Sequence, residues 1–266
     1  MEKIRSITSQ KITQEGIEPT RDCLLVETPL QIIVNGEDLS LTMQTPGDER
    51  YLVRGLLHSE GISSLEFESF HLEEWQKGLI ARVQLQEKVT PEGRRFGSSP
   101  SCGICGKRNV EGLFSSLKPL ESQTIFNQNF VIQSFKASAK KQLLFSLTGG
   151  SHGVSAIDQN GKVLCHFEDV GRHNAVDKVI GYLLEHDCLE QAKMLTLSGR
   201  VSFEIIQKCC RAGIEVLAAI SAPSSLAVEW AEKLNITLMA FCRDERFTVY
   251  SCPDRLESYQ LNMQES

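Results

Sequence analysis

The second half of the chain alternates apolar runs with amphipathic segments. In GRHNAVDKVIGYLLEH, apolar positions 176, 179, 180, 183 and 184 share one helical face and predict a helix. The runs KMLTLSG, IEVLAAISA, ITLMAFCR and RFTVYSC predict strands, and VSFEIIQKCCRAG and SSLAVEWAEKLN predict the helices between them. Upstream, LLFSLTGGSHGVSAID predicts a helix followed by a strand, and GKVLCHFED another strand. This alternation predicts a mostly parallel sheet covered on both faces by helices, over residues 131–255.

The first half has a different pattern. Residues 1–20 are polar and predict a flexible N-terminal arm. DCLLVE and LQIIVNGEDLSLTMQT predict short strands, with a tight turn at Asn35-Gly36. GDERYLVRGLLHSEG predicts a helix that ends at Gly61, and GLIARVQLQ predicts a further strand. These elements predict a small α+β domain over residues 21–90.

Between the two halves lies a segment with little to bury. Gly, Ser, Pro and Arg dominate PEGRRFGSSPSCGICGKR, so residues 91–130 predict a mobile surface loop and linker. The loop carries a CxxC pair, Cys102 and Cys105, with a glycine after each cysteine. Residues 256–266 predict a C-terminal tail. The whole chain is therefore expected to be an α/β protein with a small N-terminal α+β domain.

Composition narrows the classes of function. The chain has 266 residues, of which 41% are hydrophobic and 23% charged, as in ordinary globular proteins. A net charge of −6 gives no reason to expect nucleic-acid binding. No apolar run approaches the ~20 residues that cross a membrane, and the polar start lacks an apolar signal core. We therefore expect a cytoplasmic protein with no membrane partner.

The cysteines fit a reducing compartment better than a secreted disulfide framework. There are nine of them, an odd number, and they are scattered along the chain. Outside the CxxC pair, most are expected to be small buried hydrophobic side chains.

Three predicted strands end in residues suited to an anion. Hydroxyls and backbone N–H groups at the start of a helix or turn hold phosphate oxygens, and arginine adds a planar charged group. Ordinary helix capping is the alternative for any single strand end, but three ends on one edge favour an anionic ligand. The candidates are Ser198 and Arg200, Ser221, and Arg243 with Arg246.

The CxxC pair has three possible chemical uses, and a merely structural role is the fourth alternative, which the two glycines and the neighbouring charges disfavour. Structural zinc needs four ligands, and with only one CxxC and no histidine near it in sequence, no zinc is expected unless two chains share it. A thioredoxin-type dithiol normally starts a helix, whereas this pair lies in a glycine-flanked loop. A sulfur carrier needs an exposed, ionised thiol. Arg94, Arg95, Lys107 and Arg108 favour the thiolate, although a redox site would share this property.

Two further polar features, a cluster of four residues and a single histidine, each allow two interpretations. Glu168, Asp169, Arg172 and His173 form the densest polar cluster, directly before a predicted helix. Arg172 and His173 are candidates for contact with a pterin or a phosphate, whereas Asp169 is suited to capping the helix. His152, after two glycines, is either a ligand contact or a satisfied core histidine.

Four motifs, SCGICG, FEDVGRHNAVDKVIG, LAVEWAEKLNITLMAFCR and RFTVYS, closely resemble the FdhD family of formate dehydrogenase accessory sulfurtransferases. The resemblance runs from about residue 23 to 255. It implies that a cysteine desulfurase loads sulfur as a persulfide onto the CxxC pair. The sulfur then passes to the molybdenum (or tungsten) cofactor with two pterin guanine dinucleotides, which formate dehydrogenase requires. It also implies a homodimer.

The resemblance assigns roles to individual residues. Cys102 is the expected persulfide carrier, and Cys105 a second acceptor or a resolving thiol. The stretch Phe241, Cys242, Arg243, Asp244, Glu245 and Arg246 matches the family's cofactor-binding segment. Asp244 stands where the family often has glycine, so we expect Arg243 and Arg246, rather than Asp244, to face the ligand. GDP is the expected surrogate ligand.

The family's C-terminal half resembles the three-layer cytidine deaminase fold. In this chain GGSHGVSA has Val154 where a deaminase has its glutamate, and SAPSSLA lacks the zinc-binding cysteines. A zinc deaminase needs both features, so deamination is not expected. A base-and-phosphate pocket would still suit a guanine dinucleotide. A dithiol oxidoreductase and a zinc-bridged binding module remain the alternative functions.

Overall fold

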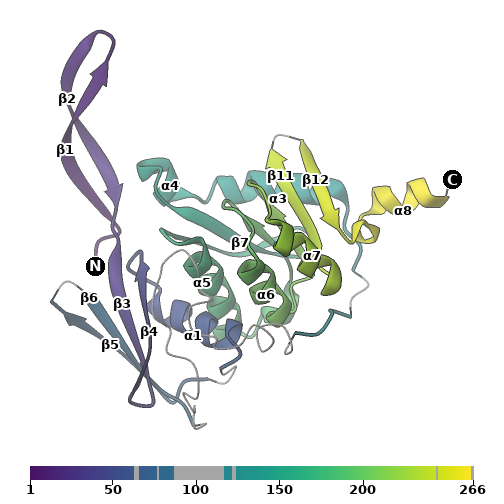
Figure 1. Cartoon of the computed structure of the whole chain (residues 1–266), viewed down its shortest axis with the longest axis horizontal. Helices are drawn as coiled ribbons and strands as arrows, with labels where there is room; N and C mark the ends of the chain where they lie inside the picture. The colour runs from purple at the N-terminus through teal and green to yellow at the C-terminus, as the bar shows by residue number, and fades with distance from the viewer. Residues whose placement is uncertain (63–65, 77, 87–116, 122–123, 244, 265–266) are drawn as a thin grey trace.

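The computed structural model describes residues 1–62, 66–76, 78–86, 117–121, 124–243 and 245–264. Cys102 and Cys105 lie outside the described residues. Within them the chain forms an α/β structure with a two-stranded hairpin, a four-stranded sheet and a six-stranded sheet. Figure 1 shows the hairpin and the small sheet at one end of the molecule and the large sheet with its helices at the other.

The first twenty residues do not form an arm without secondary structure. They belong to an antiparallel hairpin of β1 (Ile4–Thr13) and β2 (Gly16–Leu25), which projects from the body in Figure 1. Both faces of this hairpin are largely exposed, and Ile12 and Ile17 near its tip are 74% and 66% exposed. With no face to bury, the hairpin leaves no apolar alternation in the sequence, so the pattern did not reveal it.

The small sheet is built as the first half of the sequence predicts. Its order is β4-β3-β6-β5, and the turn between β3 and β4 has Asn35 and Gly36 at positive φ. The one strand that was not predicted, β5, is a largely exposed edge strand. Helix α1 packs its apolar face on this sheet, and Gly61 follows its end at φ +66°. The elements are β3 (Thr28–Val34), β4 (Glu37–Gln44), α1 (Glu49–Ser59), β5 (Ser69–Trp75) and β6 (Gly78–Gln84).

The large sheet is mixed rather than mostly parallel. Its order is β12-β11-β10-β9-β7-β8, in which β9, β10 and β11 are parallel to one another. The pairs β7–β8 and β11–β12 are antiparallel because short turns join their strands, and β7 is also antiparallel to β9. The strands are β7 (His152–Asp158), β8 (Val163–Asp169), β9 (Ala192–Leu197), β10 (Val216–Ala219), β11 (Thr237–Arg243) and β12 (Arg246–Ser251).

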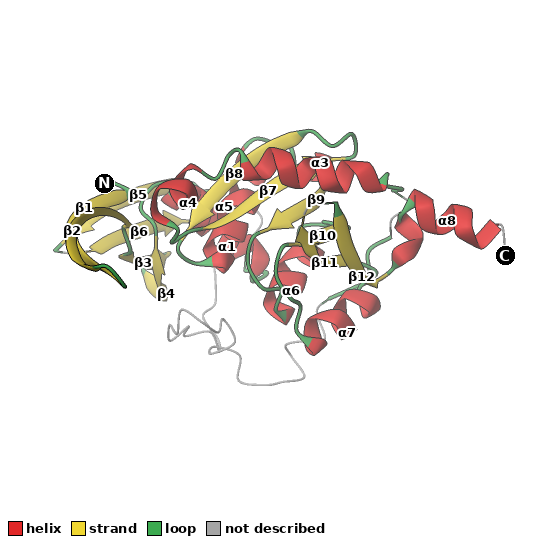
Figure 2. Cartoon of the chain, turned by 90° about the horizontal axis from the view of Figure 1, so that it is seen from above, coloured by secondary structure: helices red, strands yellow, loops and turns green. Residues whose placement is uncertain are grey.

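Helices cover both faces of this sheet, which gives three layers (Figure 2). On one face, α5 (Arg172–Glu185), α6 (Phe203–Arg211) and α7 (Ser225–Lys233) enclose the main apolar core. On the other face, α3 (Gln128–Ala139) packs on a smaller core. Sequence reasoning missed α3 because its buried positions are Val131, Ser134 and Ser138, so no apolar stripe marks it.

The small sheet is held to the large one where α1 crosses α5. A Cβ at Gly55 would overlap the carbonyl oxygen of Asp177, and a Cβ at Gly181 would overlap that of Tyr51. The two backbones can therefore approach only because both positions are glycine. Beside the crossing, the buried Asp177 carboxylate accepts hydrogen bonds from Ser59 (2.9 Å) and from Lys208 (2.8 Å), which joins α1, α5 and α6.

Short elements complete the chain. The predicted tail is partly helical, since α8 forms at its start and extends away from the body in Figure 2. No helix within the described ranges is long and apolar enough to span a membrane. The remaining elements are α4 (Leu143–Thr148), the 3-10 turns η1 (Leu189–Gln191) and η2 (Pro253–Arg255), and α8 (Glu257–Gln264).

Candidate functional site

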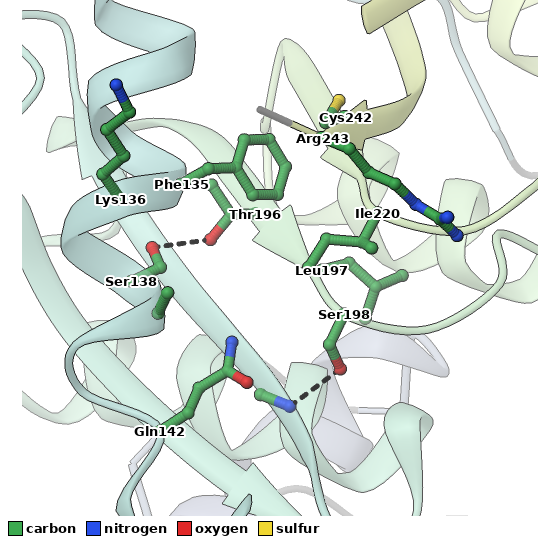
Figure 3. A pocket seen from close by; sticks show the side chains of 12 residues that line it. Phe135, Lys136, Ser138, Gln142, Thr196, Leu197, Ser198, Ile220, Cys242 and Arg243 are labelled. Carbon is green, nitrogen blue, oxygen red and sulfur yellow. Dashed lines mark hydrogen bonds between the residues drawn. The ribbon is translucent and has the colours of Figure 1, made fainter. Parts of the chain in front are cut away.

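A cavity of about 370 Å³ lies between α3 and the carboxyl ends of β9, β10 and β11 (Figure 3). Because these strands are parallel, their ends meet at one edge of the sheet, as the sequence predicts. Two predicted ligand residues from different strands, Ser198 and Arg243, line the cavity together. The full lining is Phe135, Lys136, Ser138, Ala139, Gln142, Gly153, Thr196, Leu197, Ser198, Ile220, Cys242 and Arg243.

Sequence reasoning missed the part of this lining that comes from α3 and its end. Ser138 lies on the buried face of α3, and its hydroxyl is 2.9 Å from that of Thr196 on β9. Gln142 faces the cavity from the turn before α4 (Figure 3). The serine at position 138 is the signal that was overlooked, since a buried hydroxyl usually serves a hydrogen bond.

A row of polar side chains runs from the cavity along the sheet edge. The Ser198 hydroxyl accepts a hydrogen bond from the Gly153 N–H (3.0 Å) and lies 3.3 Å from Nδ1 of His152. A Cβ at Gly199 would stand 3.1 Å from Cδ of Arg172 and 3.2 Å from Nδ1 of His152. The absence of a side chain at Gly199 therefore lets Arg172 and His152 lie against the strand end.

Burial and nearby charge set the protonation of this row. Burial lowers the pKa of His152, and the electrostatic interactions with Arg172 and His173 lower it further. The His152 imidazole is therefore neutral at pH 7. Beyond Arg172, Nε2 of His173 is 2.9 Å from the Glu204 carboxylate and 3.3 Å from the Ser202 hydroxyl. Burial alone would raise the pKa of Glu204, but the hydrogen bond and charge of His173 bring it below its ordinary value.

Most of the polar residues in the EDVGRHNAVDK motif hold the structure together. Glu168 accepts hydrogen bonds from the N–H groups of Leu144 and Phe145, both at 2.8 Å. Asp169 and Lys178 form a fully buried ion pair at 2.8 Å, which also binds the backbone of Thr45 at the end of β4. From this motif, Arg172 and His173 belong to the polar row at the sheet edge, whereas Asp169 has a structural role.

Several predicted ligand residues lie away from the cavity. Arg200 is exposed and Ser221 half-buried, and neither lines it. Arg243 and Arg246 lie opposite each other in the register of the β11–β12 hairpin, but they line different cavities. With Glu245, Arg246 lines a second cavity of about 540 Å³ against α3 and α8. Arg246 therefore does not line the cavity that Arg243 lines. Asp244 lies outside the described residues.

A bulge in β11 explains the position of Phe241. The pairing of β11 with β12 shifts between Ala240 and Arg243, and Phe241 has φ +54°, which is unusual for a bulky residue. Phe241 is therefore 42% exposed and does not line the cavity, whereas Cys242 turns inward to it. Burial raises the pKa of the Cys242 thiol to about 12, so this thiol is a neutral part of the cavity wall.

Five other described thiols, all outside the hairpin, are also poor nucleophiles. Burial raises the pKa of Cys165 to about 12 and raises those of Cys188, Cys209, Cys210 and Cys252. Only a thiolate attacks sulfur efficiently, so these protonated thiols are unsuited to sulfur chemistry at neutral pH. Within the described part of the chain, no group of three histidine, cysteine or acidic side chains is arranged to hold a metal ion.

Comparison with known proteins gives consistent matches. The model of the FdhD/NarQ family matches residues 25–257. A protein named sulfur carrier protein FdhD from Picrophilus torridus is 36% identical over 241 residues, covering 88% of this chain and 92% of that protein. One of the same name from Sulfolobus acidocaldarius is 35% identical over 261 residues, covering 96% and 99%.

A solved structure shares the fold. It is the crystal structure of a protein from Desulfotalea psychrophila described as a formate dehydrogenase accessory protein. The TM-score is 0.78 at 23% identity, with 96% of this chain and 100% of that chain covered.

Proposed function

Because the chain belongs to the FdhD/NarQ family, we propose that it is a sulfur carrier that serves formate dehydrogenase. It accepts sulfur from a cysteine desulfurase on Cys102 and delivers it to a molybdenum cofactor with two pterin guanine dinucleotides. The names of the relatives support the role of sulfur carrier, and the description of the related structure supports the link to formate dehydrogenase. We expect the working form to be a cytoplasmic homodimer.

The state of the described thiols supports uptake on the CxxC pair. Six of them have a pKa raised by burial, and Cys23 stands alone on the hairpin. Uptake is written as attack of the Cys102 thiolate on the outer sulfur of the desulfurase persulfide. The bond between the two desulfurase sulfurs breaks, the desulfurase keeps a thiolate, and Cys102 becomes a persulfide.

Delivery needs a second thiol if the sulfur leaves as sulfide. The Cys105 thiolate attacks the inner sulfur of the Cys102 persulfide, and HS⁻ departs to the metal. The dithiol is oxidised to a disulfide while the outer sulfur is reduced, so the electrons balance. A cellular thiol reductant then restores both cysteines. This step gives Cys105 the resolving role.

The polar row supports a phosphate-bearing ligand at the sheet edge. Arg243 at the cavity rim and Arg172 beside Gly199 supply positive charge, and Ser198 lies between them with its hydroxyl. The convergence of Ser198 and Arg243 on one cavity is the observation that carries this part of the proposal. We take the C-terminal unit as a cytidine-deaminase-like domain that binds a guanine nucleotide without deaminating it.

Chain length allows the thiol to meet this ligand. Leu120 is tied to Leu234 and Asn235 by hydrogen bonds of 3.0 and 2.8 Å, at the edge of the sheet opposite the cavity. Cys102 lies about 15 residues before the nearest described residue, Leu117, a length that spans up to roughly 50 Å. The strands between the two edges are only about 20 Å long. The connection is therefore long enough for delivery.

GDP binding to the purified protein tests the ligand site. We expect calorimetry to detect GDP binding, and Arg243→Ala to weaken it about tenfold by removing a charge-assisted hydrogen bond. Arg246→Ala is the matched control, because its side chain faces the other cavity, and it should leave the affinity unchanged. Absence of GDP binding at millimolar concentration, or equal losses in the two variants, would contradict the proposed site.

A further inference from the structure

The turn that leads into α5 and Arg172 is held by a buried carboxylate from the end of β8. The N-cap residue of α5 is Gly171, which has no side chain to cap the helix. The fully buried Asp169 takes that role, because its Oδ1 accepts hydrogen bonds from the Gly171 N–H (2.8 Å) and from the Asn174 side chain (3.1 Å). Its negative charge also stands at the positive end of the helix. Asp169 therefore fixes where α5 begins.

The same carboxylate is bound from the small sheet. Its Oδ2 accepts a hydrogen bond from the N–H of Thr45, directly after β4, at 3.1 Å and lies 2.8 Å from Nζ of Lys178. Lys178 also donates to the Thr45 carbonyl (2.8 Å), and the Thr45 hydroxyl accepts from the Val170 N–H (3.0 Å). The Asn174 side chain donates to the carbonyl of Met43 on β4 (2.7 Å). These bonds tie the end of β4 to the turn before α5.

Arg172 has little room on its other side. A Cβ at Gly199 would stand 3.1 Å from Cδ and 3.3 Å from Cβ of Arg172, so the stem of this side chain lies close against the strand end. The next residue, His173, is held 2.9 Å from the Glu204 carboxylate. Hydrogen bonds need donor and acceptor about 2.7–3.2 Å apart, so even a small shift of the turn would take the guanidinium out of reach of a ligand.

We propose that Asp169 is a positioning residue of the ligand site: bound to Lys178 and to the end of β4, it sets where Arg172 meets the phosphates of the ligand. The inference rests on the proposed function, which takes Arg172 as a ligand-facing residue. It makes the small sheet part of the site, although none of the described residues that line the cavity belongs to that sheet.

Two matched double variants test this role without leaving a buried charge unpaired. Asp169→Ala with Lys178→Met removes the ion pair and the acceptor for the Gly171 N–H. Asp169→Asn with Lys178→Met removes the same charges but keeps the Oδ1 acceptor. We expect the alanine variant to bind GDP about tenfold more weakly, as loss of a charge-assisted hydrogen bond from Arg172 would, and the asparagine variant to bind it normally. Calorimetry gives the affinities, and circular dichroism gives the thermal midpoints.

Combination with Arg172→Ala separates positioning from a general loss of structure. Alone, this change should weaken GDP binding about tenfold. Added to Asp169→Ala with Lys178→Met, it should weaken binding little further, whereas independent effects would multiply to about a hundredfold. The control is the other buried ion pair, also at 2.8 Å, which lies in the middle of α5. Asp177→Ala with Lys208→Met should lower the thermal midpoint and keep the affinity for GDP.

The outcomes separate this inference from the proposed function. If the unaltered protein does not bind GDP, the proposed ligand site itself is wrong. If it binds GDP, the positioning role is overturned by normal binding in the alanine variant, by equal losses in the two matched variants or in the control, or by a multiplied loss with Arg172→Ala. Each of these results would leave the ligand site intact.

Gly171→Ala decides the question if the alanine variant does not fold. Its methyl group would stand 3.0 Å from Nδ2 of Asn174 and push that amide away from Asp169, while the buried ion pair remains. The φ of −100° at this position is one that alanine adopts without strain. We expect GDP binding to weaken about threefold, and unchanged binding would overturn the inference.

Discussion

Replacing Cys102 by alanine is expected to abolish the uptake of labelled sulfur from a cysteine desulfurase. The reason is chemical, because uptake requires a thiolate and burial raises the pKa of six of the seven described thiols. Mass spectrometry after desulfurase treatment should find one added sulfur atom on the unaltered protein, removable by reductant. It should find none on the Cys102→Ala variant.

Two further variants make this result specific. Cys23→Ala removes the half-exposed thiol of the hairpin and should leave uptake unchanged. Cys105→Ala should still load sulfur on Cys102 but fail to release it, if Cys105 is the resolving thiol. Normal uptake by Cys102→Ala would remove this residue from the mechanism. Catalytic reduction of insulin disulfides would instead favour the alternative of a dithiol oxidoreductase.

The second large effect concerns stability. Gly181→Ala should destabilise the protein by about 3 kcal/mol, because the new methyl group meets the Tyr51 carbonyl across the α1–α5 crossing. In an ordinary helix the same change stabilises by about 0.5–1 kcal/mol, so the expected sign is reversed. A loss of this size is a large part of the 5–15 kcal/mol that holds a typical domain folded. The measurement is the midpoint of urea unfolding.

Replacing a second glycine, one with open space around its Cβ position, is the control that separates the steric clash from other effects of introducing alanine. Gly213 follows α6 at φ +68° with no atom within 4 Å of its Cβ position. Gly213→Ala should therefore cost only the roughly 1–2 kcal/mol of a left-handed residue. If Gly181→Ala were as stable as the unaltered protein, the two helix backbones could not be as close as the structure has them. Gly55→Ala meets the same crossing from α1 and should behave like Gly181→Ala.

The elements that could be predicted are those that bury one face. Helix α5 and strands β9, β10 and β11 carry apolar positions at clear spacing, and their bounds follow that pattern closely. The hairpin β1–β2 exposes both faces, and α3 buries two serines, so neither has the pattern that a prediction needs. The order and the relative directions of the strands could not be predicted either, because a pattern of buried positions does not show which strands are neighbours or whether they are antiparallel.

The site shows a similar division. Ser198 and Arg243 could be found because they end apolar strands, a position where ligands of α/β sheets gather. That Arg246 lines a different cavity from Arg243 could not be predicted, because it depends on how the β11–β12 hairpin turns the two arginines. Gln142 and Thr196 were missed because their proximity depends on α3 lying over the sheet. The bulge at Phe241 also left no trace in the apolar pattern.

The central claim is that sulfur carried on Cys102 goes to a ligand whose nucleotide is held at the carboxyl edge of the same chain. The direct test loads the protein with labelled sulfur, adds inactive formate dehydrogenase with its molybdenum cofactor, and measures label transferred to the cofactor with and without excess GDP. Saturating GDP should block this delivery while leaving the loading of Cys102 unchanged. Delivery at the same rate in the presence of saturating GDP would contradict the account.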